Sequence, residues 1–302
     1  MSKKKAPVKH PRTRRRFALQ SLALAAACAG MLFAGGPGAD AQSSPAPASG
    51  GDIVYLDRVR FDPTEGACVY TLPERALVRV RFGVRMSCLL CTPVDWRIQE
   101  PGEHRIPFDC AVGDQPLQIN PARLMATVQT CALPKNFTPT RGAEDADFER
   151  LAALSASQRA ARSKTQDETR SINPFWRNGL AREPGFTIEF RNGTETEPNT
   201  YFLPEQTVFR IKLPEREQAT RFTAAGAELT IYVDFVLLEE EDAPATGTER
   251  KLSLASVPPG EHILTFNIRD PNSNVGAQSY RIHRLAEGES PPAPQVIAPH
   301  LR

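Results

Sequence analysis

The sequence predicts an all-β protein built from two immunoglobulin-like antiparallel β-sandwich modules that a helical linker joins. A Pro-Gly turn that leads into an alternating strand occurs twice, at 101–109 (PGEHRIPFD) and at 259–267 (PGEHILTFN). Each copy follows a Leu-Pro-Glu element, at 72–74 and at 203–205. Short alternating segments separated by turn residues recur in both halves, which is typical of a sandwich. The repeated strand pattern therefore indicates two modules of one class.

The first module is expected at 52–134. Its expected strands are 53–56, 68–72, 78–82, 88–96, the segment after the first Pro-Gly turn, and 124–131. Alternation along 78–82 places the apolar side chains of this strand on the inner face. The same alternation predicts that Arg79 and Arg81 face water.

A linker is expected at 135–184. Its stretch 144–162 is Ala-rich and charged, with apolar residues at near-helical spacing, which predicts a helix. The helix is only weakly amphipathic, so we expect it to lie across a surface or to bridge the modules. Phe175 and Trp176 follow in a non-helical stretch. Such a pair is expected to fill a seam between domains, and contact with a partner protein is the alternative.

The second module is expected at 185–286, followed by a disordered Pro-rich tail at 287–302. Its expected strands are 186–190, 207–213, 229–238, 251–254, 262–269 and 279–283. The acidic run 239–242 is interpreted as a solvated strand end that keeps a sheet edge from pairing, with a docking surface for a basic partner as the alternative. Alternating oxygen side chains at 270–276 suit a hairpin turn better than a calcium site, because a downstream acidic clamp is missing.

Residues 1–41 are expected to be a cleaved signal peptide. A basic start precedes an apolar stretch at 17–34 and a small-x-small cleavage site. A twin-arginine signal and an ordinary basic start both fit the arginines at 14–16. A lipoprotein modified at Cys28 and an uncleaved membrane anchor are the alternatives. The protein is therefore expected in the periplasm or outside the cell, with no integral membrane span after cleavage.

Removal of the signal changes the charge of the chain. Eight of the 37 Lys and Arg and one of the 35 Asp and Glu lie before Gln42, so the net charge becomes −5 where the full chain has +2. A flexible Ser/Pro/Gly linker is expected at 42–51. The remaining sequence has no basic patch with interleaved aromatic residues, which argues against a nucleic-acid partner.

Several runs of the first module resemble a known family. The segments 69–74 (VYTLPE), 78–83 (VRVRFG) and 101–109 are similar to the immunoglobulin-like domain of flagellar hook-capping proteins and related secreted bacterial proteins. Where that family has Trp-Asp-Gly, this chain has Phe-Asp-Cys at 108–110. The second module is similar to bacterial immunoglobulin-like repeats. Both resemblances imply display, spacing or protein contact without catalytic residues. The hook-capping role itself is not implied, because a cleavable signal does not suit export through a flagellum.

Five cysteines remain after cleavage, and all lie in the first module: Cys68, Cys88, Cys91, Cys110 and Cys131. An exported chain meets oxidising conditions, which favours disulfides. An odd number of cysteines leaves at least one thiol over if all pairing is intramolecular. Strand alternation turns Cys68 and Cys110 into the sandwich, so a bridge between them is geometrically plausible. An extended segment would turn Cys88 and Cys91 to opposite sides, with Cys131 as one candidate partner. A turn there would bring these two thiols together.

The functional hypotheses follow from these patterns. Converging Cys88 and Cys91 thiols would support redox chemistry, or a metal site together with Cys110 and Cys131. His104 and His262 share one repeat position, which favours a structural role, and we predict no catalytic residue and no cofactor. We expect an exported, non-catalytic accessory, assembly or protein-binding factor of the bacterial envelope, with another envelope protein as its partner. The alternatives are a periplasmic thiol-redox or metal-handling protein and a carbohydrate-binding protein.

Overall fold

The computed structural model describes most of the chain beyond the N-terminal region. The described residues are 56, 59–62, 64–134, 136–162, 180–217 and 219–292, with the backbone alone at 155–162 and 220. Contacts divide the chain into Met1–Ala46 and Pro47–Arg302, and every described residue belongs to the second unit. The predictions for 1–41, 42–51, 53–55, Phe175, Trp176 and 293–302 lie outside the described residues. Strands dominate the described part, which confirms the all-β class.

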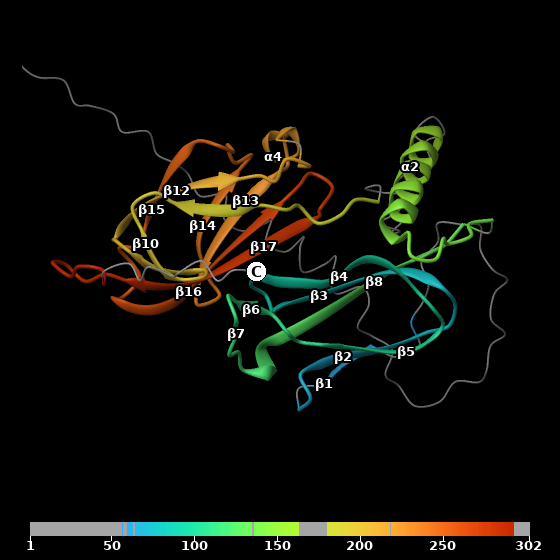
Figure 1. Cartoon of the computed structure of the whole chain (residues 1–302), viewed down its shortest axis with the longest axis horizontal. Helices are drawn as coiled ribbons and strands as arrows, with labels where there is room; N and C mark the ends of the chain where they lie inside the picture. The colour runs from blue at the N-terminus through green and yellow to red at the C-terminus, as the bar shows by residue number, and fades with distance from the viewer. Residues whose placement is uncertain are drawn as a thin grey trace, which may run out of the picture. The chain divides into compact units, whose positions relative to one another are not determined.

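The first sandwich has two three-stranded antiparallel sheets. Its elements are β1 Val59–Asp62, β2 Ala67–Leu72, β3 Ala76–Val84, β4 Leu89–Gln99, β5 Gly102–Pro107, β6 Ala111–Val112, β7 Gln115–Pro116, the 3-10 helix η1 Pro121–Arg123 and β8 Leu124–Ala132. One sheet has the order β1-β2-β5 and the other the order β4-β3-β8, while β6 and β7 pair separately (Figure 1). Tyr70, Val78 and Phe82 are fully buried in the core of this sandwich. The inner faces of β2 and β3 thus meet as the alternation predicts.

A helix covers the outer face of the β4-β3-β8 sheet. Helix α2 Glu144–Arg162 spans the residues predicted to be helical, and acidic side chains fill its first turn, where the helix dipole favours them. Phe148 and Leu151 are buried in one cluster with Leu77 of β3 and Trp96 of β4. The helix therefore packs across a surface of the first sandwich, beside β4 (Figure 1).

The outer face of β3 is not solvated. Arg79 is only 2% exposed, and Arg81 is partly buried. The prediction that Arg79 and Arg81 face water is therefore wrong. Alternation correctly separates the two faces of β3, but it does not reveal that α2 and the segment 180–183 cover the second face.

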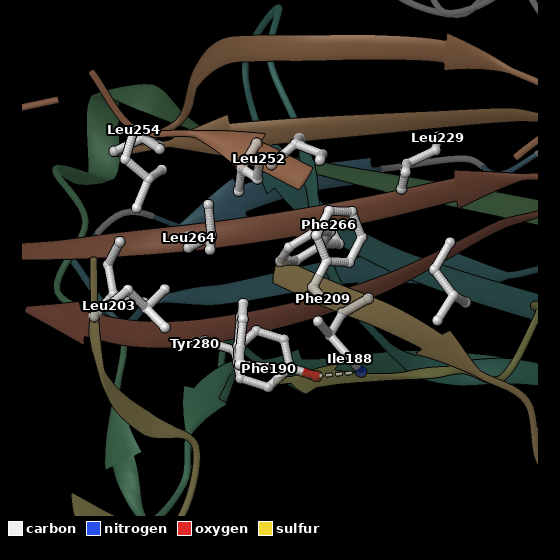
Figure 2. Packing of buried hydrophobic residues seen from close by; sticks show 14 of the residues in the cluster. Ile188, Phe190, Leu203, Phe209, Leu229, Leu252, Leu254, Leu264, Phe266 and Tyr280 are labelled. Carbon is white, nitrogen blue, oxygen red and sulfur yellow. Dashed lines mark hydrogen bonds between the residues drawn. The ribbon is translucent and has the colours of Figure 1, made fainter. Parts of the chain in front are cut away.

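The second sandwich packs a three-stranded sheet on a six-stranded one. Its elements are β9 Thr187–Phe190, β10 Thr194–Glu197, β11 Thr200–Leu203, β12 Gln206–Lys212, the short helix α4 Thr220–Thr223, β13 Glu228–Val233, β14 Val236–Asp242, β15 Glu249–Ser253, β16 Gly260–Arg269 and β17 Val275–Arg284. The sheet orders are β15-β12-β9 and β10-β11-β17-β16-β13-β14. Figure 2 shows the core between them, where Phe209, Phe266 and Tyr280 pack among leucines. The Ile188 N–H donates to the buried Tyr280 hydroxyl at 2.9 Å, and burial raises the pKa of Tyr280 to about 12.

The two Pro-Gly elements have the same local geometry. Gly102 and Gly260 have φ values of +128° and +121°, which residues with a side chain rarely adopt. The Nε2 atom of His104 lies 2.8 Å from the carbonyl oxygen of Glu100, and that of His262 lies 2.9 Å from the carbonyl oxygen of Pro258. Each ring therefore ties a strand start to the residue four positions earlier, which confirms a shared structural role for the two histidines.

The apolar run 229–238 is a hairpin and not the single strand that was predicted. The chain turns at Asp234 and Phe235, whose φ values are +48° and +67°. The carboxylate of Asp234 accepts a hydrogen bond from the Ile263 N–H at 2.9 Å and lies 2.7 Å from Nδ1 of His262. These contacts to β16 hold the turn. Its only local turn signal is Asp234, because neither Gly nor Asn is present.

One strand pair departs from the expected antiparallel pattern. Strand β11, which together with β10 was not predicted, pairs with β17 in parallel. Pro204 follows β11 directly and lacks an N–H donor, and the chain then enters β12 in the opposite sheet. The crossing at Leu203-Pro204 allows a short strand to join the six-stranded sheet before the chain changes layer.

Candidate functional site: the junction between the sandwiches

A buried arginine lies at the centre of the junction between the two sandwiches. Nε of Arg79 donates to Asp95 Oδ1 at 2.8 Å, and Nη1 donates to Asn274 Oδ1 and pairs with Glu183, each at 3.0 Å. Nη2 also donates to the carbonyl oxygen of Ala181. The guanidinium lies 4.6 Å from the ring centre of Trp96, a cation–π distance. Its donors are therefore shared among the first sandwich, the chain segment 181–183 and the second sandwich.

A bulge between β3 and β4 brings two of these partners to Arg79. Val78 pairs with Arg97 and Val80 with Val94, so β4 has one extra residue opposite Arg79. Trp96 in this bulge has a φ of +48°. The bulge re-aims consecutive side chains of β4, which explains why both Asp95 and Trp96 reach the same guanidinium.

The segment 181–183 links the ion pairs of the first sandwich to the second. The Glu183 N–H donates to Asp95 Oδ2 at 2.9 Å, and Arg81 Nε donates to Glu183 Oε1 at 2.8 Å. The second carboxylate oxygen of Glu183 accepts a hydrogen bond from the Val275 N–H of β17 at 2.7 Å. Glu183 therefore contacts two arginines of β3 and the main chain of the second sandwich.

Burial disfavours the charged forms of the side chains in this cluster. Desolvation lowers the pKa of Arg79 to about 10, while nearby Glu183 and Asp95 act in the opposite direction. Desolvation also raises the pKa of Glu183 against the influence of Arg81 and Arg79. Two cations face two carboxylates here, so the charges compensate one another only while all four side chains remain in place.

The loop 270–275 is organised by one buried carboxylate. Asp270 Oδ1 accepts from the N–H groups of Asn272 and Asn274, both at 2.9 Å, and Arg221 Nε donates to Asp270 Oδ2 at 2.7 Å. The oxygen-rich run at 270–276 is thus a turn held by its own amides, as interpreted from the sequence. This turn presents the side-chain oxygen of Asn274 to Arg79.

A second polar contact joins the sandwiches near the start of β4. The side-chain oxygen of Asn267 accepts from the Leu89 N–H at 2.8 Å, and its amide nitrogen donates to the Leu89 carbonyl at 2.9 Å. Leu89 begins an edge strand of the first sandwich, and Asn267 lies on β16. The amide therefore satisfies main-chain groups that an edge strand otherwise leaves open.

Apolar and close main-chain contacts complete the junction. Tyr232, Phe235 and Ile263 of the second sandwich pack against the core cluster of the first. A Cβ at Gly113 would lie 2.5 Å from the carbonyl oxygen of Pro198, so the main chains approach too closely there for a side chain. The two sandwiches share buried surface as well as hydrogen bonds.

The cysteines form a different pairing from the one expected. Cys91 and Cys110 form a disulfide with a Cα–Cα distance of 5.8 Å, so the plausible bridge between Cys68 and Cys110 is wrong. Cys68 lies opposite Ile106 on β5, and β5 ends at Pro107. The strand alternation therefore cannot be extended as far as Cys110.

The remaining thiols are buried. Cys68 and Cys88 are free, and burial raises the pKa of each to about 11. Cys131 is buried, with its sulfur 3.6 Å from the carbonyl oxygen of Ala132. The thiols of Cys88 and Cys91 do not pair with each other, and the disulfide occupies two members of the alternative four-thiolate set. Within the described residues, no group of three or more His, Cys, Asp or Glu side chains is placed to hold a metal ion.

The Arg79 cluster was not predicted from the sequence. Its traces in the sequence are two arginines within an otherwise apolar strand, a carboxylate on the next strand at Asp95, and a distant one in the linker at Glu183. Phe175 and Trp176, the predicted partner-contact residues, lie outside the described residues.

Comparison with known proteins adds little to this picture. No protein-family model and no curated protein matches the chain. Among solved structures, the chain is similar to the fibronectin(III)-like modules of Clostridium thermocellum CbhA, with 8% sequence identity, a TM-score of 0.22, and coverage of 73% of this chain and 86% of that one. A TM-score this low supports no inference about function, so the fold assignment rests on the sheets and cores described above. Over the described part of the chain, no helix is both long and apolar enough to span a membrane.

Proposed function

We propose that this chain is an exported, non-catalytic immunoglobulin-like factor of the bacterial cell envelope that contacts a partner protein through two sandwiches held in a fixed arrangement. The observation that carries the proposal is the Arg79 cluster, in which one guanidinium contacts Asp95, Glu183 and Asn274. The expected division into modules at 52–134 and 185–286 belongs to the same proposal.

Buried ion pairs suit a positional role better than a purely stabilising one. Desolvation offsets much of their attraction, so well-packed apolar side chains stabilise a core at least as well. Ion pairs and hydrogen bonds depend on direction, in contrast, so those around Arg79 favour one arrangement of the two sandwiches. A binding protein with two fixed surfaces loses less conformational freedom when it meets a partner, which favours affinity and specificity.

The thiol-redox alternative finds less support in the cysteine geometry. Cys91 is bonded to Cys110, and the pKa of Cys88 is raised to about 11 by burial. A buried thiol with a raised pKa provides little thiolate at neutral pH, and thiolate is the reactive form.

Site-specific photo-crosslinking in the envelope of the producing cells tests the proposal. A benzophenone amino acid at the exposed Met86, beside the junction, is expected to give a discrete adduct with one envelope protein. The matched control is the same substitution at Val59, an exposed position on β1. The adduct should weaken when Arg79→Met loosens the junction. Equal adducts at both positions, no adduct at position 86, or a Cys88-dependent thiol-exchange activity would contradict the proposal.

A further inference from the structure

Strand β14 is an exposed sheet edge. It ends the order of the six-stranded sheet and pairs with β13 on one side. Its other side therefore presents main-chain N–H and carbonyl groups to solvent, as an edge strand does. Such an edge can accept an additional strand from another chain.

The start of β14 is apolar where a protected edge would be charged. Val236 is 66% exposed and Leu237 is 51% exposed. Consecutive residues of a strand point to opposite faces, so the edge is uncovered on both faces at this end. Proteins that avoid edge pairing place Lys, Pro or bulges at such positions. Strand β14 has no Lys or Pro, and its pairing with β13 shifts register once, at Leu238, between the apolar and the acidic halves of the strand.

A third exposed apolar side chain lies beside this edge. Met86 is 91% exposed in the turn between β3 and β4, with a φ of +56° that is uncommon outside Gly and Asn. Ser87 Oγ donates to the carbonyl oxygen of Phe235, so Met86 and Val236 each adjoin a residue of this contact. Of the four large hydrophobic side chains exposed within the described part of the chain, three gather here, and the fourth is Val59.

The other half of β14 carries an excess of negative charge, which Arg250 and Arg269 offset only in part. Its residues 239–242 are all acidic, and of these only Glu241 has an ion-pair partner in the described structure, Arg250. Burial and the neighbouring Glu228 and Asp242 raise the pKa of Glu240. Added positive charge at this end of the strand would relieve the repulsion.

Charge also decides between candidate occupants of the edge. A second copy paired antiparallel to β14 would set its apolar start beside the acidic run of the first, so neither half would meet a complementary residue. A parallel copy would place the two acidic runs side by side, which like-charge repulsion opposes. A segment of a partner with basic residues at one end and apolar residues at the other complements both halves of β14.

We propose that β14 and Met86 form a docking site for an extended segment of a partner protein, which adds to the sheet as an antiparallel strand. In this orientation the segment has its basic residues first, along 239–242. Its apolar residues follow, against Val236, Leu237 and Met86. The inference rests on the proposed function and deepens it by naming the kind of partner.

A defined peptide probe tests the docking site on the full chain. The probe is a fluorescein-labelled, C-terminally amidated Lys-Thr-Lys-Thr-Val-Thr-Val-Thr peptide, measured by fluorescence anisotropy and by amide chemical shifts. We expect saturable binding with shifts confined to β14 and the Met86 turn. Leu237→Lys and Glu240→Lys should each weaken binding about tenfold, because they remove apolar contact or reverse charge. Val59→Lys, the matched control on another sheet edge, should leave binding unchanged.

Two modified probes separate strand addition from a general attraction. N-methylation of alternate peptide amides removes donors to β14 and should abolish binding, and replacing Lys by Glu should do the same. If Leu237→Lys fails to fold, as judged by circular dichroism, the exposed Glu240→Lys variant keeps the test decisive.

Several results would overturn the inference. These are no binding at about 1 mM peptide, a range that covers weak recognition, equal binding of the N-methylated probe, or equal weakening by Val59→Lys. A dimer in sedimentation that Leu237→Lys dissolves would assign the edge to a second copy instead. A crosslink at position 86 without peptide binding would retain the proposed function and reject strand addition, whereas loss of both would reject the two together.

Discussion

Arg79 shows how a single side chain can depend on partners from distant parts of the sequence. Its contacts come from β4, from the segment 181–183 and from the loop before β17. A guanidinium presents several donors in a fixed planar fork, which suits it to hold three such elements at once. Lysine at this position could not reproduce that geometry.

Replacement of this arginine should be costly. Arg79→Met leaves Asp95 and Glu183 without their shared cation, and we expect the free energy of unfolding to fall by about 3–5 kcal/mol. Urea unfolding measures the change. Arg97→Met, at an exposed position on β4, is the control and should stay within about 0.5 kcal/mol of the parent. A further change of Glu183→Gln should recover part of the loss, and an Arg79→Met protein of parental stability would contradict the assigned role.

His283 should make stability depend on pH. Desolvation lowers its pKa, but hydrogen bonds to Glu261 at 2.8 Å and Glu289 at 3.0 Å outweigh this, so the pKa is raised above 6.5. The raised pKa means that the charged ring stabilises the folded state fully below pH 6.5 and that this contribution is lost as pH rises through the folded-state value.

The effect of His283 should be small, because the group is partly solvated. The stability difference between the parent and His283→Gln should be less than about 1 kcal/mol at acidic pH and should shrink at alkaline pH. Ring titration by NMR checks the direction of the pKa shift. A measured pKa at or below the unperturbed value would show that the two carboxylates do not hold the ring in solution.

At the scale of elements, the disulfide connects the two sheets of the first sandwich. Cys91 lies on β4, and Cys110 follows β5 of the opposite sheet. Their separation is 19 residues, and closing a loop of this size in the unfolded chain stabilises a protein by about 3 kcal/mol in the chain-entropy model. The bond therefore holds the sheets together where no strand pairing does.

Removing both sulfurs tests this role. The double variant Cys91→Ala/Cys110→Ala should lose about 2–4 kcal/mol of unfolding free energy. The parent measured in a thiol reductant is the matched control and should lose a similar amount. A parent that is insensitive to reductant would mean that Cys91 and Cys110 are not bonded in the purified protein.

Strand and helix prediction succeeded where local periodicity governs structure. The helix at 144–162 and the segments that became β3, β8 and β16 follow from apolar spacing along a few residues. The turn at Asp234 was missed because one aspartate is a weak turn signal within an apolar run and contacts with β16 hold the turn. Apolar spacing over a few residues contains no information about contacts with a strand about 30 residues later, such as those between Asp234 and β16.

At the scale of the whole molecule, the junction makes the two sandwiches interdependent. Asn267 bonds to Leu89, Phe235 packs on the first core, and a Cβ at Gly276 would lie 2.1 Å from the carbonyl oxygen of Pro184. The folded state of each sandwich is therefore stabilised by contacts across the junction as well as by its own core. The sequence could predict two sandwiches but not this surface. Arg79 and Asp95 are 16 residues apart, but the hydrogen bonds that tie them to the segment 181–183 and to the second sandwich join residues 87 to 195 apart.

Shared contacts predict cooperative unfolding. The parent should show one calorimetric transition, because neither sandwich retains its buried surface once the other unfolds. Gly276→Ala forces a methyl group against main chain and should separate the scan into two transitions by opening the junction. Gly247→Ala is the control for destabilisation without a clash at the junction: the φ of +76° at Gly247 strains an alanine, but a Cβ there would meet nothing within 4 Å. This variant should unfold at a lower temperature and still in one transition. Two transitions in the parent would show that the sandwiches unfold independently.

The contact between Asn267 and Leu89 constrains the evolution of these two positions to different degrees. Asn267 uses its side chain, whereas Leu89 offers only its backbone. This contact therefore tolerates any residue except proline at position 89, since proline lacks the N–H donor, while position 267 must retain a carboxamide of the same reach. Among descendants of this protein, the asparagine should persist where the leucine is replaced.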